Sequence, residues 1–381
     1  MLFQLSPNSP RFAVFELLNK ELLYFIEQSI TSKTFLRELF SAGAVGQACW
    51  DNAKENDKRA ERDLTRDKFA KLFAALQGEQ ESVRRQLLKV CRDNQDLGIF
   101  FANPNRNLLG FLPPRCESAL KNLATHLYCA TKDLQALKDE AGGIDINAHF
   151  NSFRALAANG NVCKACGMEE LAPYRAGVPD GDQWRADYDH QLCKSKYPIF
   201  AVHPDNLVPL CDVCNQDAKE AKDLFRSDNG SDRVTFYPHA EEAKDLVGIE
   251  IGRLLDPEPT INVVWLTNDT TQVDKLETWN EVYGIRSRVE GRFRSLEVVL
   301  EDEINPNGLR HLKSQIKHKA RSISEETLKR KEWAYWHHKL FQKLSSIDIV
   351  PFWEKSKFTK EQGADGGEYI LNFARQNAKN P

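Results

Sequence analysis

Two Cys-x-x-Cys pairs, Cys163/Cys166 and Cys211/Cys214, are separated by 44 residues. Each pair is a tight turn that can aim two thiolates at one point, and four thiolates are the donor set of a closed, tetrahedral structural zinc site. The chain has nine cysteines, an odd number that argues against a complete disulfide framework. The sequence therefore predicts one structural Zn²⁺ that staples together the ends of a small module.

The residues between the two pairs predict a β-hairpin. The stretch WRADYDHQ alternates in polarity and predicts a strand that ends at Asp189-His190. The stretch NLVPL, which begins at Asn206, predicts a second strand that pairs back on the first. A loop from Leu192 to Asp205 joins the two strands.

A helix is expected directly after the hairpin. The stretch DVCNQDAKEAKDLF favours a helix on which Asn215, Lys219 and Lys222 share one face, at positions i, i+4 and i+7. Laid across the hairpin, that face brings Asn215 to Asp189 and His190. A carboxylate and an amide oxygen are hard ligands that suit Mg²⁺ or Mn²⁺. An imidazole held off that metal can take a proton from an attacking water.

This run resembles the zinc-braced branch of the HNH, or ββα-metal, endonuclease superfamily. The resemblance rests on the pattern DH-x-x-x-K-S-x-Y-P…N-L-V-P-x-C-x-x-C-N and covers roughly residues 160 to 240. It implies that Asp189 and Asn215 bind the catalytic metal, that His190 is the general base, and that Asn206 fixes the hairpin and orients the base. Two positions depart from the pattern. Cys193 stands where that branch usually has proline, and the basic residue after the last asparagine, Lys219, has no following glycine.

The implied reaction is one-metal hydrolysis of a phosphodiester, with DNA the favoured substrate over RNA. Several basic residues could hold the substrate backbone, and such contacts carry no sequence information. The same residues could equally be a solvated helix face. They are Lys194, Lys196, Lys219, Lys222 and Arg226.

Around this module the sequence predicts a mainly α fold, with a zinc-stapled ββα-metal insert between helical regions. We expect a helical N-terminal part (1–150), an HNH nuclease module (155–245) and a mostly helical C-terminal part (246–381). Apolar periodicity predicts helices from 12 to 26, from 52 to 93 with a weak break at Gly78, from 116 to 138, from 274 to 293 and from 308 to 346. The stretch 261–268 reads as a strand, and the tail after Lys355 is polar.

Composition limits the functional classes. A chain of 381 residues is long enough for two or three domains, and its net charge of −3 requires any nucleic-acid contact to come from a local basic patch. With no apolar run of membrane-spanning length and no signal-peptide pattern, a cytoplasmic protein without membrane contact is expected.

The helical ends are expected to recognise a target, a partner protein or a second copy of the chain, and to restrain the nuclease. A role in defence against phage or foreign DNA would follow from such restraint. The alternative is a catalytically silent, zinc-dependent nucleic-acid-binding or scaffold protein. A coiled-coil oligomeriser is a weaker third interpretation, because the heptads are not sustained.

Overall fold

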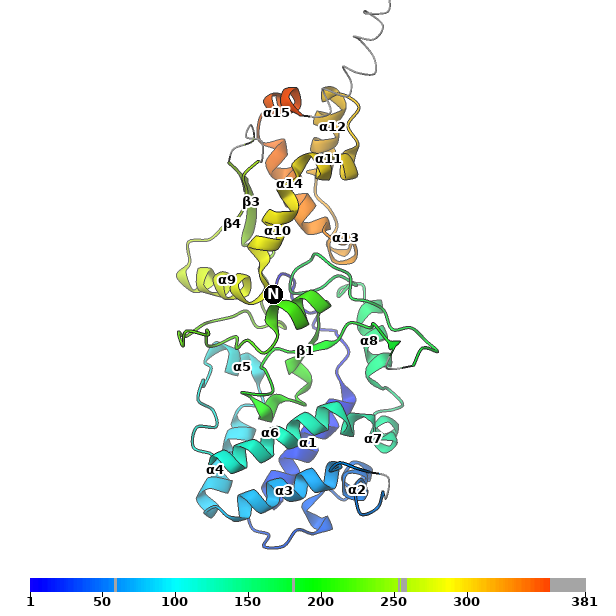
Figure 1. Cartoon of the computed structure of the whole chain (residues 1–381), viewed down its shortest axis with the longest axis vertical. Coiled ribbons are helices and arrows are strands. Elements are labelled where there is room, and N and C mark those ends of the chain that lie inside the picture. Colours follow the sequence, from blue (N-terminus) through cyan, green and yellow to red (C-terminus); the bar gives the residue numbers. More distant parts are fainter. Residues whose placement is uncertain (58–59, 180–181, 253, 255–258, 357–381) are drawn as a thin grey trace, which may run out of the picture.

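The computed structural model describes residues 1–57, 60–179, 182–252, 254 and 259–356. The molecule is elongated, with helices at both ends and a short β-hairpin between them (Figure 1). Helices α1 to α7 gather at one end, and α10 to α15 lie with strands β3 and β4 at the other. The predicted mainly helical fold with a small β portion is therefore confirmed.

In the N-terminal part, the described residues form eight α-helices. Helix α1 buries Phe15, Leu18, Leu22 and Phe25, which recur at helical spacing on one face. The charged stretch, predicted to be helical from residue 52, is helical in its described residues only from Thr65 and forms two helices separated at Gly78. The predicted helix from 116 to 138 ends early, at Cys129. The bounds are α1 (Ala13–Gln28), α2 (Ala44–Asp51), α3 (Thr65–Gln77), α4 (Glu81–Asp93), α5 (Leu97–Ala102), α6 (Pro114–Cys129), α7 (Gln135–Glu140) and α8 (Ile146–Ala155).

The C-terminal part begins with an antiparallel pair of strands, β3 (Val247–Ile251) and β4 (Ile261–Trp265). Only β4 was predicted. Helices follow, and Gly284, with φ +63°, separates the first two where one had been expected. The bounds are α9 (Thr270–Tyr283), α10 (Ile285–Phe293), α11 (Leu296–Ile304), α12 (Leu309–Lys319), α13 (Glu325–Arg330), α14 (Ala334–Ser345) and α15 (Val350–Lys355). Residues 357–381 of the polar tail lie outside the described residues.

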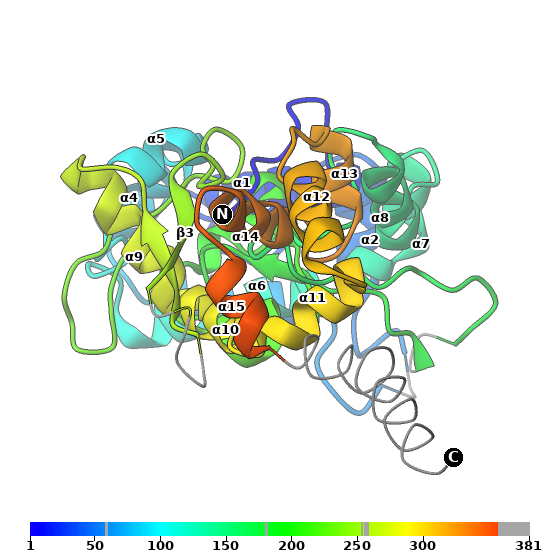
Figure 2. The same cartoon turned by 90° about the horizontal axis from the view of Figure 1, so that it is seen from above.

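The N-terminal residues and two tryptophans of the C-terminal part contact the first cysteine pair in the middle of the molecule. The backbone amide of Phe3 donates to the carbonyl of Lys164 at 3.1 Å. The indole of Trp279 donates to the carbonyl of Ala165 at 2.7 Å, and the indole of Trp336 donates to that of Cys166 at 2.8 Å. Seen along the long axis, α10, α12 and α14 lie over the middle of the molecule (Figure 2). The division into three parts stays a prediction.

Within the described part of the chain, every helix is too short or too polar to cross a bilayer.

Candidate functional site

The four cysteines of the two Cys-x-x-Cys pairs converge on one buried point. Their Sγ atoms all lie within 4.8 Å of one another, and those of Cys166 and Cys211 are 3.9 Å apart. A tetrahedral zinc with Zn–S bonds of about 2.3 Å sets its sulfurs about 3.8 Å apart. Gly167 follows the first pair with φ +66°, and its amide donates to the Cys163 carbonyl at 2.9 Å, which closes the turn. The group can therefore hold a structural metal such as zinc.

Arg288 of α10 contacts this cluster from the C-terminal part. Its guanidinium donates to Cys214 Sγ at 3.2 Å and to Glu169 Oε1 at 3.0 Å, and it lies 3.8 Å from Cys166 Sγ. A guanidinium offsets the negative charge that thiolates carry at a metal site. Sequence reasoning missed Arg288 because nothing in its local pattern links it to cysteines 74 and 122 residues away.

The predicted hairpin is present and short. Strand β1 (Tyr188–His190) pairs antiparallel with β2 (Leu207–Pro209), so that Asp189 faces Val208 and His190 faces Leu207 across the ladder. Because neighbouring residues of a strand point to opposite faces, the backbone alone does not bring Asp189 and His190 together. The loop and the following helix must complete the site.

Asn206 closes the loop of the hairpin. Its Oδ1 accepts from the Leu192 amide at 2.7 Å, and its Nδ2 donates to the carbonyls of Leu192 and Phe200 at 3.0 and 2.9 Å. The side chain is fully buried, and its backbone carbonyl accepts from the Gln191 amide at 2.9 Å. These bonds brace the backbone directly after His190. Such bracing is compatible with the architectural role that the resemblance implied, and the role itself stays a prediction.

His190 is held in one neutral form. Its Nε2 lies 2.9 Å from the carbonyl oxygen of Ala201, so Nε2 carries the proton and Nδ1 keeps its lone pair. The residue is 9% exposed. Burial, followed by the positive charge of Lys194, lowers the pKa of His190 to about 3. The imidazole is therefore neutral throughout the physiological pH range.

An open cleft of about 570 Å³ lies beside the hairpin, and Asp189, His190 and Asn215 all line it. Tyr128, at the end of α6, forms part of one wall, and its ring meets the His190 ring edge-on with centroids 4.3 Å apart. Three of the four predicted catalytic residues thus border one cavity. Carboxylate oxygen, amide oxygen and neutral imidazole are the groups needed for metal-assisted hydrolysis.

The helix after the hairpin is not the α-helix expected. Residues Val213–Lys219 form the π-helix η6, whose i→i+5 pattern is visible in the 3.0 Å bond from the Glu220 amide to the Asn215 carbonyl. The helix ends at Lys219, so Lys222 lies beyond it. The expectation that Asn215, Lys219 and Lys222 share one α-helical face is therefore wrong.

Lys219 points to the hairpin and is 1% exposed. Its Nζ donates to Asp189 Oδ1 at 2.9 Å and to the His190 carbonyl at 2.7 Å. The second oxygen, Asp189 Oδ2, accepts from Gln191 Nε2 at 2.6 Å. Burial raises the pKa of Asp189, and the charge of Lys219 opposes that rise. The donor types suit a divalent cation, yet an internal ammonium already neutralises the carboxylate.

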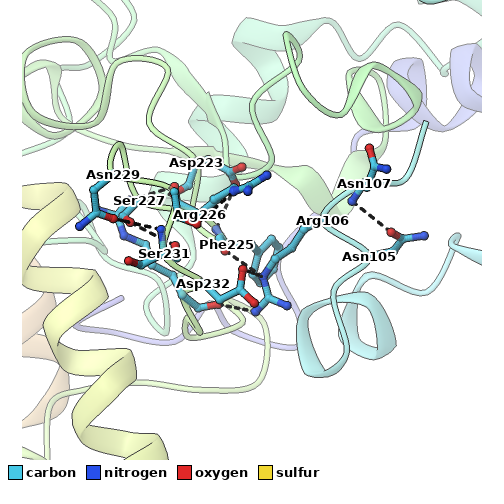
Figure 3. Close-up of polar contacts among 12 residues, drawn as sticks. Asn105, Arg106, Asn107, Asp223, Phe225, Arg226, Ser227, Asn229, Ser231 and Asp232 are labelled. Atoms are coloured by element: carbon cyan, nitrogen blue, oxygen red, sulfur yellow. Dashed lines mark hydrogen bonds and ion pairs between the residues drawn. The ribbon is translucent and has the colours of Figure 1, made fainter. Parts of the chain in front are cut away.

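The remaining basic residues proposed for phosphate contact divide into two groups. Lys194 lines the cleft, with Nζ 5.0 Å above the Tyr128 ring. The others bond within the protein. Lys196 pairs with Asp223 at 3.3 Å, and Lys222 donates to the Ala218 carbonyl at 2.7 Å. Arg226, whose loop is drawn in Figure 3, donates to the Gly230 carbonyl at 3.2 Å. Lys132 and Arg185 also line the cleft, and no motif in the sequence identified them.

Comparisons with protein-family models, with characterised proteins and with solved structures found no match for this chain. What the site can do therefore has to be argued from its own geometry.

Proposed function

We propose that this chain is an HNH-type endonuclease that hydrolyses phosphodiester bonds of DNA with Mg²⁺ or Mn²⁺ and is braced by a structural Zn²⁺. One observation carries the proposal. The neutral His190, whose Nδ1 keeps its lone pair, lines the same cleft as Asp189 and Asn215. This combination is the minimum for activating a water beside a metal-bound phosphate.

In this mechanism Asp189 and Asn215 would hold the divalent ion, which would supply stabilisation of the negative charge that develops on the phosphate. His190 Nδ1 takes the proton of the water that attacks phosphorus, the bond between phosphorus and the 3′ oxygen breaks, and the 3′ oxygen leaves with the electron pair and takes a proton from solvent. The hydrogen bond from Nε2 to the Ala201 carbonyl fixes the tautomer and the ring orientation during this transfer. Lys194, at the cleft wall, is placed to hold a phosphate oxygen.

The alternative is a catalytically silent, zinc-dependent nucleic-acid-binding or scaffold protein. Two observations favour it: the ion pair between Lys219 and Asp189, and the pKa of about 3 for His190, which makes a weak base. A silent protein would bind nucleic acid equally well after Mg²⁺ is chelated, and it would be indifferent to His190→Ala.

Cleavage of supercoiled plasmid by the full, zinc-loaded chain in Mn²⁺ tests the proposal. His190→Ala should lower the rate by roughly 10²- to 10⁴-fold, and EDTA should abolish cleavage. His203→Ala is the matched control, because His203 is also buried and also lies with Nε2 at a backbone carbonyl, that of Gln95 at 3.0 Å. Equal rates for wild type and His190→Ala, at equal folded fraction, would contradict the proposal.

We further propose that the helical ends restrain the nuclease until a target, a partner protein or a second copy of the chain binds, as suits defence against phage or foreign DNA. The contact of Arg288 with the cysteine cluster supports this, since it ties the C-terminal helices to the nuclease module. Restraint would be contradicted if the isolated module of residues 155–245 cut plasmid no faster than the full chain.

A further inference from the structure

Lys219 occupies the side of Asp189 on which a cation would bind. Lysine ammonium groups are rarely buried, and this one lies between the Asp189 carboxylate and the His190 carbonyl, at 2.9 and 2.7 Å. Gln191 Nε2 donates a hydrogen bond to the second carboxylate oxygen, Asp189 Oδ2. The same two oxygens are those that a metal would use. Two cations cannot share one buried carboxylate without strong mutual repulsion, so occupancy by Lys219 and occupancy by a divalent ion exclude each other.

The π-helix η6 is what brings Lys219 to this position. A π turn holds about one more residue than an α turn, so rewinding the segment as an α-helix would turn Lys219 about the helix axis. Directly after it, Glu220 has φ 49° and ψ −118°, a backbone conformation that favours glycine. Such strain persists where the surrounding contacts impose it. Relief of this strain by rewinding the segment as an α-helix would move Lys219 away from Asp189.

We propose that Lys219 is a built-in cation that keeps the Asp189 site closed, and that a divalent ion enters only when Lys219 leaves. The proposal rests on the proposed function, because it takes Asp189 as the metal ligand. In the closed state, Asp189 and Asn215 line the cleft, but Lys219 neutralises the Asp189 carboxylate. The open state is the one able to cut.

Binding of Mn²⁺ to the full, zinc-loaded chain, followed by the electron paramagnetic resonance signal of free Mn²⁺, tests the competition. If the open state is populated at about 1 to 10%, removing Lys219 should tighten the apparent Kd by roughly 10- to 100-fold. The test variant is Lys219→Met. Lys222→Met is the matched control, because Lys222 Nζ bonds to the Ala218 carbonyl at 2.7 Å and not to Asp189. Asp189→Asn should abolish Mn²⁺ binding both in the wild-type chain and in the Lys219→Met variant.

An unchanged or weaker Kd in folded Lys219→Met would overturn the proposal. If that variant does not fold, the wild type provides a second test. Reductive methylation followed by mass spectrometry should find Lys219 protected without Mn²⁺ and modified at saturating Mn²⁺. Exposed Lys20 should react equally in both conditions. Continued protection of Lys219 at saturation would also overturn the proposal.

Plasmid cleavage by the same proteins separates this proposal from the proposed function. Tighter Mn²⁺ binding by Lys219→Met without cleavage would support the closed cation site and refute the nuclease. Cleavage by the wild type with no change of Kd in Lys219→Met would support the nuclease and refute the closed site. If neither protein binds Mn²⁺ at Asp189, both proposals fail and the silent alternative stands.

Discussion

Replacement of Arg288 by methionine should weaken zinc binding without touching a cysteine. Arg288 makes a hydrogen bond of 3.2 Å to Cys214 Sγ and a longer contact of 3.8 Å to Cys166 Sγ, and its side chain is 19% exposed. A hydrogen bond to a charged partner contributes about 1.5–3 kcal/mol, and partial exposure places this one toward the lower end. Removal of outer contacts at metal sites costs roughly 10- to 100-fold in affinity, or about 1.4–2.8 kcal/mol. The two ranges agree, so we expect the Kd for Zn²⁺ to rise by roughly 10- to 100-fold.

The assay is competition for zinc between the folded chain and a chromophoric chelator of known affinity. Arg286→Met is the matched control on the same helix, because the Arg286 guanidinium lies 4.1 Å from the Trp265 ring centroid and 3.2 Å from Glu277. We expect its Kd to stay within about twofold of wild type, since no cysteine ligand loses a contact. Equal affinities for Arg288→Met and wild type would refute the reasoning, as would equal losses in the two variants.

Three further substitutions test other parts of the structure by urea unfolding. Burial lowers the pKa of His149 to about 4 in the folded chain. As the pH falls, the His149 imidazole is therefore protonated in the unfolded chain before it is protonated in the folded chain. The contribution of this buried neutral imidazole to stability is lost as pH falls from about 6.5 to 4. His149→Gln should therefore remove about 2 kcal/mol of the stability difference between pH 7 and pH 5, whereas the exposed control His318→Gln should leave it unchanged. Glu220→Gly should stabilise the fold by about 1 kcal/mol by relieving the φ of 49°, and Glu220→Ala should give no such gain; destabilisation by glycine would contradict the strain. Asn206→Ala should cost about 2–4 kcal/mol, because three backbone groups lose a buried partner, and a cost below about 1 kcal/mol would show that Asn206 does not brace the loop.

The parts of the site that the sequence predicted are those determined by short-range rules. Each Cys-x-x-Cys pair forms its turn locally, and two such turns that share one metal must meet. The strand that ends at His190 was predicted from alternating polarity, and the strand after Asn206 from the stretch NLVPL, although both strands are buried at every position. The convergence of four cysteines and the antiparallel hairpin could therefore be expected from residue types and spacing alone.

The parts that were missed depend on long-range contacts. The residues of η6 have ordinary α-helical propensity, and the buried pair of Lys219 with Asp189, 30 residues apart, accompanies the wider π turn. Arg288 reaches its cysteines from a helix far along the chain. Helix α6 ends at Cys129 without glycine or proline in the following CATKD stretch, and its last turn instead forms a wall of the cleft. Local patterns carry no information about such partners.

The contacts at the C-terminal end give restraint a physical route. Arg288 bonds Cys214, and Cys214 lies in the same π-helix that ends at Lys219. A displacement of α10 would therefore act on the first turn of η6, while the Lys219–Asp189 pair fixes its last turn. Coupling of this kind requires an element with two arrangements that both sites bias, and rewinding of the seven-residue π-helix η6 as an α-helix would provide it. A ligand that pulls α10 away from the cysteine cluster would then favour departure of Lys219 from Asp189. Zinc bound to the four cysteines, with Arg288 in contact, would favour the closed state.

This route predicts that Arg288→Met tightens Mn²⁺ binding at Asp189 while it weakens Zn²⁺ binding at the cysteines. Weaker binding of both Mn²⁺ and Zn²⁺ in this variant would refute it.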